Sequence, residues 1–227
     1  MGKQTEKIDN HSALILLSGG QDSTTCLAWT KKKFKEVVGI TFDYGQLHKI
    51  EISSAKKIAK LTKTPLKIYK ISLFKDFTKN ALTDSSVKIN AGGKNSLPST
   101  FVDGRNHIFL SIAAIYAKQL NIHNIVTGVC QTDYSGYPDC RDNFIKLLEK
   151  TLTLAMDYKF KIHTPLMWLT KAKTVELAKK LKTINLLKYT HTCYKGSRPA
   201  CGKCPACKLR LKGFKEAGIK DPIKYKI

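Results

Sequence analysis

Short apolar runs, separated by polar segments, mark the first part of the chain. Residues 13–17 are continuously apolar, residues 37–42 form a second apolar run, and residues 66–71 alternate between apolar and polar side chains. A continuous run of this length is typical of a buried parallel strand, and alternation is typical of a strand with one exposed face. These patterns predict three strands, and a further apolar run at residues 124–129 predicts a fourth.

Helical periodicity fills the intervals between these strands. Apolar residues recur every three or four positions over residues 24–32, 48–61, 107–120, 142–157 and 170–182. Residues 75–100 have neither period and are predicted to form a long loop. Alternating strands and helices predict an α/β fold, a Rossmann-like parallel sheet with helices on both faces.

Length and hydropathy narrow the class of protein. A chain of 227 residues with 42% hydrophobic content suits one α/β domain with a small appendage. No apolar run approaches the roughly 20 residues that span a bilayer, and the polar residues 1–12 do not resemble a signal peptide. We therefore expect a cytoplasmic protein without a membrane partner.

The strongly basic composition suggests nucleic-acid binding, with a formal net charge of +23. However, only four of the 40 basic residues are arginines, at Arg105, Arg141, Arg198 and Arg210, and the lysines are scattered. We interpret the lysines as a solvated surface and expect no stable nucleic-acid partner. Because lysine cannot replace the planar fork of arginine, each arginine is a candidate for a specific contact.

A glycine-containing segment, Ser-Gly-Gly-Gln-Asp-Ser at residues 18–23, joins the first predicted strand to the following helix. Its glycines let backbone N–H groups approach an anion, and the helix N-terminus favours phosphate. We expect Ser23 to cap the helix, Ser18 to donate a hydroxyl, and Asp22 to hold Mg²⁺. The alternative is an ordinary strand–helix turn. The segment is neither a Walker A motif nor a dinucleotide fingerprint.

Four of the seven cysteines are grouped near the C-terminus. They are Cys193, Cys201, Cys204 and Cys207. Two residues between neighbouring cysteines let both thiolates reach one tetrahedral ion, and four sulfur ligands leave no position for water. We expect one structural Zn²⁺, with an iron–sulfur cluster as the alternative. Cys26, Cys130 at the end of the fourth strand, and Cys140 are expected to be small apolar residues.

Polar and aromatic residues also gather at residues 101–106, before a predicted helix, and at residues 133–141, after a predicted strand. A tyrosine in the second segment can stack on a planar heterocycle, and a carboxylate can accept hydrogen bonds from a guanine-like edge. A surface loop rich in turn-forming residues is the alternative.

These motifs together resemble a known family. The loop at residues 18–23 is similar to that of the PP-loop ATP pyrophosphatases. From end to end, the chain resembles the 7-cyano-7-deazaguanine synthase family, in residues 18–23, 43–46, 104–106, 133–141, 164–166 and the cysteine group with residues 209–210 and 213–214. His48 and Glu51 also match. The chain departs from the family at Asp103, where proline is usual, which affects the shape of the loop before Arg105.

The resemblance implies an adenine nucleotide α-hydrolase-like fold and an ATP-dependent carbon–nitrogen ligase of queuosine biosynthesis. Such an enzyme converts 7-carboxy-7-deazaguanine and ammonia into the nitrile preQ0 through an adenylated carboxylate and an adenylated amide, and releases AMP and pyrophosphate. The family also implies a homodimer. The alternatives are a PP-loop enzyme of the thiouridine or lysidine type that modifies tRNA directly, and a non-enzymatic zinc-ribbon protein.

The resemblance also gives the candidate residues their roles. Asp22, Arg105 and Asp133 are the expected catalytic residues. The expected nucleotide-binding residues are Leu17, Ser18, Gly19, Gly20, Gln21, Asp22, Ser23, Thr24, Thr25, Cys26 and Leu27. The expected substrate-binding residues are Tyr134, Tyr137, Asp139, Arg141, His48 and Glu51. His48 and Glu51 are expected to cap the substrate pocket, with a surface pair as the alternative. We expect residues 1–188 to form the nucleotide-binding domain and residues 189–227 a zinc-binding region packed on it.

Overall fold

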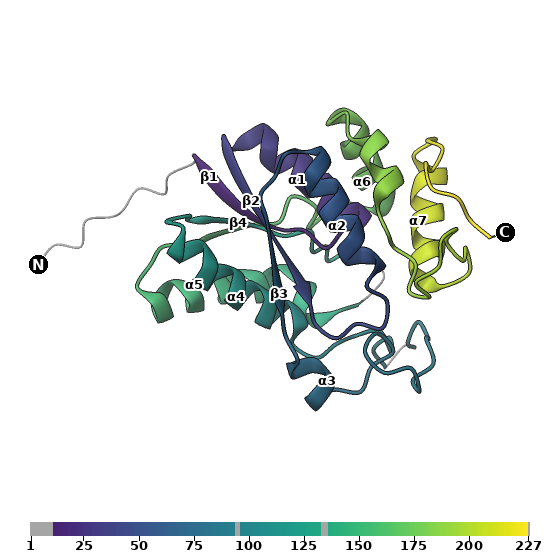
Figure 1. Ribbon diagram of the computed structural model, residues 1–227, viewed down its shortest axis with the longest axis horizontal. Coiled ribbons are helices and arrows are strands. Elements are labelled where there is room, and N and C mark those ends of the chain that lie inside the picture. The colour runs from purple at the N-terminus through teal and green to yellow at the C-terminus, as the bar shows by residue number, and fades with distance from the viewer. Residues whose placement is uncertain (1–10, 94–95, 133–135, 227) are drawn as a thin grey trace, which may run out of the picture.

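A single parallel sheet organises the molecule (Figure 1). The computed structural model describes residues 11–93, 96–132 and 136–226. The strand order is β3-β2-β1-β4-β5, and every neighbouring pair is parallel. The strands are β1 (Ser12–Leu16), β2 (Glu36–Asp43), β3 (Leu66–Lys70), β4 (Asn124–Val126) and β5 (Lys161–His163). The strand order reverses between β1 and β4. Open α/β sheets bind ligands at such a reversal, beyond the carboxyl ends of the strands, so a ligand site is expected beyond β1 and β4.

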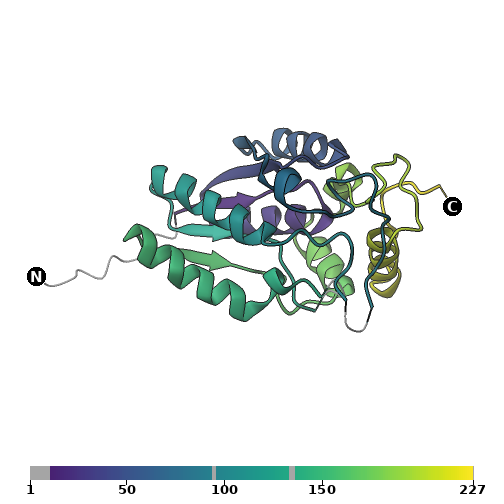
Figure 2. The ribbon, with the colours of Figure 1, turned by 90° about the horizontal axis from the view of Figure 1, so that it is seen from below.

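Helices cover both faces of the sheet (Figures 1 and 2). The helices α1 (Gln21–Lys33) and α2 (Ile50–Leu61) lie on one face, and α4 (Arg105–Gln119) and α5 (Asp142–Met156) lie on the other. In β1, Leu14 packs with α4 and α5, whereas Ala13 and Ile15 pack with α1 and α2. All three side chains are fully buried, so neither face of β1 tolerates a polar residue. The predicted α/β fold with a parallel sheet is confirmed.

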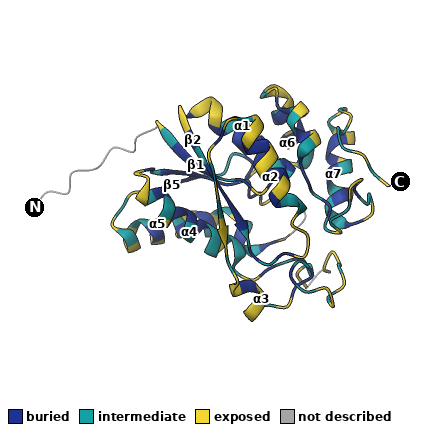
Figure 3. Ribbon diagram, viewed as in Figure 1, coloured by how far each residue is buried: buried dark blue, intermediate teal, exposed yellow. Residues whose placement is uncertain are grey.

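Burial follows this layering, with buried central strands and exposed outer faces on the surrounding helices (Figure 3). The other helical elements are α3 (Leu73–Phe77), α6 (Lys171–Lys180) and α7 (Pro205–Glu216), with the 3₁₀ helices η1 (Pro138–Cys140) and η2 (Ile184–Tyr189). None of the helices in the described ranges is long and apolar enough to cross a membrane.

The C-terminal helix α7 packs against α6. Phe214 of α7 shares a small buried cluster with Val175 and Ala178 of α6. Arg210 is 1% exposed and donates two hydrogen bonds to Asp221, at 2.8 and 2.9 Å, and a third to Thr190 at 2.7 Å. Since a buried guanidinium needs such partners, Arg210 ties the C-terminal residues to the chain before the cysteines.

Two local predictions are wrong. Helix α1 begins at Gln21, with Gly20 at the N-cap and no side-chain cap, so Ser23 does not cap it. Ser23 lies in the first turn, where its hydroxyl donates to the Gly20 carbonyl at 3.2 Å. The fourth strand ends at Val126, and Cys130 therefore lies beyond it. Beyond the strand, Gly128 lies against the start of α1, where a Cβ would stand 3.1 Å from the Ser23 amide nitrogen.

Candidate active site

A cavity of about 360 Å³ lies beyond the carboxyl ends of β1, β2 and β4. Its lining includes the loop after β1, Tyr44 after β2, residues 127–130 after β4, and Arg105 at the start of α4. Lys171 of α6 and residues 191–194 close the remaining side. The volume falls within the range of small-molecule sites, about 300–1,000 Å³.

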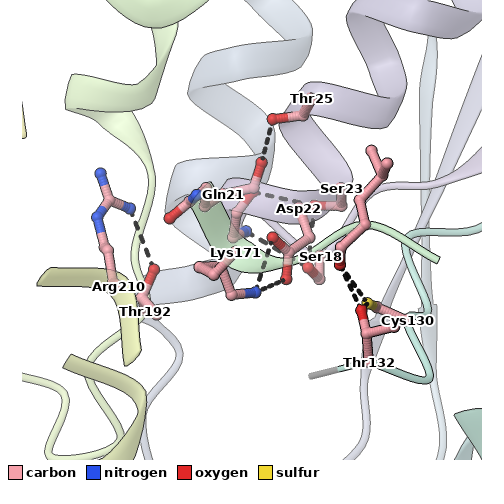
Figure 4. Close-up of polar contacts among 12 residues, drawn as sticks. Ser18, Gln21, Asp22, Ser23, Thr25, Cys130, Thr132, Lys171, Thr192 and Arg210 are labelled. Carbon is pink, nitrogen blue, oxygen red and sulfur yellow. Dashed lines mark hydrogen bonds and ion pairs between the residues drawn. The ribbon is translucent and has the colours of Figure 1, made fainter. Parts of the chain in front are cut away.

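The loop between β1 and α1 forms one wall of this cavity. Figure 4 shows its side chains Ser18, Gln21, Asp22 and Ser23. Gly19 has φ +84°, and a Cβ there would overlap the Glu51 carbonyl, so the loop packs directly on α2. The Ser18 and Ser23 hydroxyls lie 3.0 Å apart, and the Gly20 amide donates to Ser18 Oγ at 3.3 Å. The N-terminus of α1 therefore meets the cavity together with two hydroxyl groups, an arrangement that suits an anion.

Gln21 supplies a donor that lacks a partner in the protein. Its side chain is 4% exposed and lines the cavity, and Nε2 has no hydrogen-bond partner in the described part of the chain. A buried donor left unpaired costs about 1–3 kcal/mol. The position therefore fits a ligand that brings an acceptor, such as a phosphate oxygen.

Asp22 of this loop forms an ion pair with Lys171 (Figure 4). The two Nζ–oxygen distances are 3.1 and 2.9 Å. Lys171 is the first residue of α6, after the N-cap Thr170, and its side chain is only 10% exposed. Gly213 of α7 fits beside the Lys171 side chain, because a Cβ there would overlap its methylenes.

Arg105 approaches the cavity from the opposite wall. Its Nη1 donates to Tyr44 Oη at 3.4 Å, and the guanidinium carbon lies 5.7 Å from the Tyr44 ring centroid. Burial opposes the charge of Arg105, but Tyr44, Tyr137 and Asp139 outweigh this and raise its pKa. The side chain is therefore a permanent cation beside the cavity.

Glu51 and His48 both line the cavity. Gln46 holds Glu51, since its Nε2 donates to Glu51 Oε1 at 3.1 Å while its own Oε1 accepts the Tyr44 amide at 2.8 Å. Burial raises the pKa of Glu51, and the Arg105 charge and the Gln46 hydrogen bond offset this in part. His48 is exposed at the rim, where a Cβ on Gly196 would overlap its ring.

Only some residues of the predicted substrate motif line the cavity. Tyr137 lines the cavity, and its hydroxyl hydrogen-bonds Thr100 at 2.7 Å. Asp139 is buried outside the lining and accepts the Asn106 amide at 2.9 Å, which holds the first turn of α4. Arg141 is exposed at the N-cap of α5, away from the lining. Asp133 and Tyr134 lie outside the described residues.

Likewise, only part of the predicted nucleotide-binding segment lines the cavity. The residues of this segment that line the cavity are Leu17, Ser18, Gly20, Gln21, Asp22 and Ser23. Gly19 shapes the turn. Thr24 and Thr25 donate to carbonyls of their own helix, Cys26 contacts the Thr127 carbonyl, and Leu27 belongs to the core. These last four residues face away from the cavity because α1 turns them toward the sheet and its own backbone.

Sequence reasoning missed Lys171, Tyr44 and His191 as residues of the site. His191 is buried, its amide donates to the Gly19 carbonyl at 3.0 Å, and its Nε2 lies 2.9 Å from the Cys193 carbonyl. Burial lowers the pKa of His191 to about 4, so the ring is neutral at pH 7. Tyr44 lies in a segment that the family resemblance covers, but nothing in the local sequence distinguishes Lys171 from other lysines.

The cysteine group lies next to this cavity, and Cys193 contributes to both. One sulfur from each of Cys193, Cys201, Cys204 and Cys207 lies within 4.8 Å of the others. The Cys201 and Cys207 sulfurs are 3.9 Å apart, close to the about 3.8 Å separation expected for sulfurs 2.3 Å from a tetrahedral zinc. The amides of Cys201 and Cys204 donate to sulfurs of the group at 3.5 and 3.3 Å. The group can therefore hold a metal ion.

A family model described as queuosine biosynthesis protein QueC matches residues 12–218, which include the cavity and the cysteine group. The chain belongs to the QueC family. The resemblance inferred from the motifs is thus confirmed over nearly the whole chain, and QueC membership favours the predicted ligase over an enzyme that modifies tRNA directly.

Two similar proteins from other organisms have the same name. A protein of Chromobacterium violaceum is 49% identical over 218 residues, which cover 94% of this chain and 93% of the relative. One of Clostridium acetobutylicum is 52% identical over 212 residues, or 92% and 96% of the two chains. Both are called 7-cyano-7-deazaguanine synthase. Among solved structures, an NH₃-dependent NAD synthetase from Campylobacter jejuni gives a TM-score of 0.48 at 20% identity, covering 82% of this chain and 70% of that one.

Proposed function

We propose that this protein is an ATP-dependent carbon–nitrogen ligase that converts 7-carboxy-7-deazaguanine and ammonia into 7-cyano-7-deazaguanine for queuosine biosynthesis. The observation that carries the proposal is the cavity in which an anion-binding loop faces the half-buried cation Arg105. Its QueC membership and the shared name of its relatives supply the substrate class.

The loop would hold the pyrophosphate end of ATP. Ser18, Ser23 and the unpartnered Gln21 Nε2 supply donors, and Lys171 adds positive charge. Asp22 would orient Mg²⁺, because a carboxylate together with phosphate oxygens forms the oxygen-rich set that this ion prefers. Bound Mg²⁺ would neutralise charge on the phosphates.

Arg105 would stabilise the negative charge that develops at the α-phosphate. An oxygen of the substrate carboxylate attacks the α-phosphorus, and pyrophosphate leaves. The nitrogen of ammonia then forms a bond to the activated carbon, and AMP leaves with the electrons of the broken C–O bond, giving the amide. A second ATP adenylates the amide oxygen with release of pyrophosphate, and loss of AMP together with both protons of the amide nitrogen leaves the nitrile. One site can serve both rounds because each presents an α-phosphate to a substrate oxygen.

The deazaguanine would lie against Tyr137, which can stack on its ring. Asp133 or Asp139 would read the base edge through its carboxylate, and Tyr134 is the alternative stacking residue. Asp139 already accepts a backbone amide, which makes it the weaker candidate for base recognition. The exposed position of Arg141 likewise disfavours direct contact with the substrate.

The cysteine group would bind one structural Zn²⁺, since four thiolates at these separations match its tetrahedral geometry. We also propose a homodimer formed through the outer faces of α4 and α5. Ile115, Leu147 and Leu154 are 53%, 62% and 82% exposed there, an apolar surface that a second copy would cover.

The test is incubation of the zinc-loaded protein with ATP, Mg²⁺, ammonium and 7-carboxy-7-deazaguanine, followed by mass spectrometry of the products. The nitrile together with AMP is expected. The nitrile with ADP would keep the ligase but overturn the role of the loop. With the fold and zinc content verified, failure to consume the deazaguanine would favour the tRNA-modifying alternative, which bulk tRNA binding would then test.

A further inference from the structure

The proposed reaction requires a base that its substrates do not supply. At neutral pH the nitrogen source is almost entirely ammonium, which has no lone pair, so a group in the site must remove a proton before the carbon–nitrogen bond can form. Within the described residues, the carboxylates and imidazoles that line the cavity are Asp22, His48, Glu51 and His191.

Three of these four groups are poorly suited to the task. Asp22 is ion-paired with Lys171 at 2.9 Å. His191 is already held by the protein, with Nε2 2.9 Å from the Cys193 carbonyl and its backbone amide bound to the Gly19 carbonyl. His48 is exposed at the rim, where its ring packs on Gly196.

Glu51 has a different environment. Gln46 Nε2 binds Oε1 at 3.1 Å, and within the described structure no donor binds Oε2, which leaves that oxygen for a ligand. Gln46 is itself fixed, because it donates to the Phe42 carbonyl at 3.2 Å and accepts the Tyr44 amide at 2.8 Å. The carboxylate is therefore held in one orientation at the cavity wall. Burial also raises the pKa of Glu51, which makes its carboxylate a stronger base.

Glu51 is also close to the place where the nitrogen must attack. Its backbone carbonyl packs against Gly19 of the phosphate loop, and Arg105 is near enough for its charge to lower the pKa of Glu51. The loop and Arg105 are the two groups that would hold the phosphates of the adenylate. The activated carbon would be bonded to an α-phosphate oxygen held by these two groups, in the cavity whose wall includes Glu51.

We propose that Glu51 forms an ammonium subsite and is the base that converts the bound ion to ammonia. This inference rests on the proposed function. A Glu51 carboxylate oxygen takes one proton from ammonium, and the freed lone pair forms the C–N bond as the C–O bond to AMP breaks. The nitrogen then loses a second proton to the departing phosphate or to solvent, which gives the neutral amide. No oxidant or further reactant is needed.

The test compares Glu51→Gln with the wild type in two reactions. Exchange of labelled pyrophosphate into ATP, with the carboxylate substrate but without ammonium, reports adenylation alone. Product formation is then measured with ammonium and, separately, with hydroxylamine, which is largely uncharged at pH 7 and needs no base. We expect Glu51→Gln to retain exchange and hydroxylamine use, and to lose about 100-fold or more in kcat/KM for ammonium, as is typical of a missing general base.

Two further variants make the result specific. Glu51→Asp keeps a carboxylate and should recover part of the ammonium reaction, which a purely structural role would not predict. Glu36→Gln, at a side chain that is 71% exposed, should leave all three measurements unchanged.

Equal losses with ammonium and hydroxylamine, or loss of exchange in folded Glu51→Gln, would overturn the proposal and assign Glu51 to substrate binding. Absence of exchange in the wild type would instead refute the proposed function on which the inference depends. The two failures are therefore distinguishable.

Discussion

Single residues of the site illustrate what local sequence can and cannot predict. The loop at residues 18–23 was predicted from adjacent residues, and the structure places it at a cavity. Lys171 could not be predicted, because it is 149 positions from Asp22 and only the fold brings them together. Arg210 was predicted to make a specific contact, and its partners Asp221 and Thr190 show that the contact is structural.

Lys171→Met should weaken ATP use while preserving packing beside Gly213, because methionine keeps much of the apolar stem. The variant removes a buried charge and leaves Asp22 without its lysine. We expect kcat/KM for ATP to fall about 10- to 100-fold, as for the loss of a charge-assisted hydrogen bond. The rate of pyrophosphate release, measured at steady state over a range of ATP concentrations, gives this kcat/KM. Lys173→Met, exposed on the same helix, is the control, and equal activity in both variants would contradict a role for Lys171 at the phosphates.

His163 should make folding sensitive to mild acid. Its ring lies 5.8 Å from Trp29 and 5.6 Å from Phe34, and burial lowers its pKa to about 4, against about 6.5 in an unfolded chain. The unfolded state therefore binds a proton first, so stability is full above pH 6.5 and is lost as pH falls toward 4.

Thermal unfolding at pH 7, 6 and 5 tests this expectation. Tm should fall across the series, and His163→Gln should reduce the fall without abolishing it, since His191 has a similarly lowered pKa. A pH dependence that is the same in the variant and the wild type would show that His163 does not contribute.

Among the elements, predictability followed burial and length. The strands β1 and β2 were predicted because burial on both faces demands an unbroken apolar run. The strand β5 was not predicted, since its three residues are too few to show a period. Helix α7 was also missed because it begins at Pro205 inside the cysteine group, where ligand spacing rather than helical periodicity dominates the pattern.

Metal removal should act on one element selectively. Cys204 precedes α7 and Cys207 lies in its first turn, so an ion bound by the group fixes the start of this helix. Chelation, or Cys204→Ser, should accelerate amide hydrogen exchange in residues 193–216 and leave α1 and α2 nearly unchanged. Hydrogen-exchange mass spectrometry with parallel zinc analysis measures this. Cys26→Ala, outside the group, should retain zinc, and slow exchange of α7 in the zinc-free protein would contradict the prediction.

For the whole molecule, the boundary between residues 1–188 and 189–227 stays a prediction. The two parts share several contacts, including the cluster between α6 and α7 and the hydrogen bond from Arg198 to Ser54 at 2.6 Å. Sequence alone identified the C-terminal region by its cysteines but could not show these contacts, which join residues far apart in the chain.

The proposed homodimer can be tested at its most exposed apolar residue. Leu154→Glu places a charge on the outer face of α5, where the wild-type side chain is 82% exposed. We expect the variant to sediment as a monomer under conditions in which the wild type is dimeric, with an unchanged circular dichroism spectrum. Analytical ultracentrifugation measures the oligomeric state of the variant and of the wild type, and circular dichroism checks the fold. Lys150→Glu, also exposed on α5, controls for charge alone, and a dimeric Leu154→Glu protein would place the interface elsewhere.

Cys193 belongs both to the cysteine group and to the cavity wall, and its carbonyl also holds His191. An ion on the cysteines and a nucleotide in the cavity would therefore order the same short stretch of chain. Linkage is reciprocal, so whatever affinity zinc adds for ATP, ATP must add for zinc. When zinc is scarce, the ATP-bound enzyme would retain its metal longer than the ATP-free enzyme. The supply of the deazaguanine product would then depend on the zinc and ATP concentrations of the cell together.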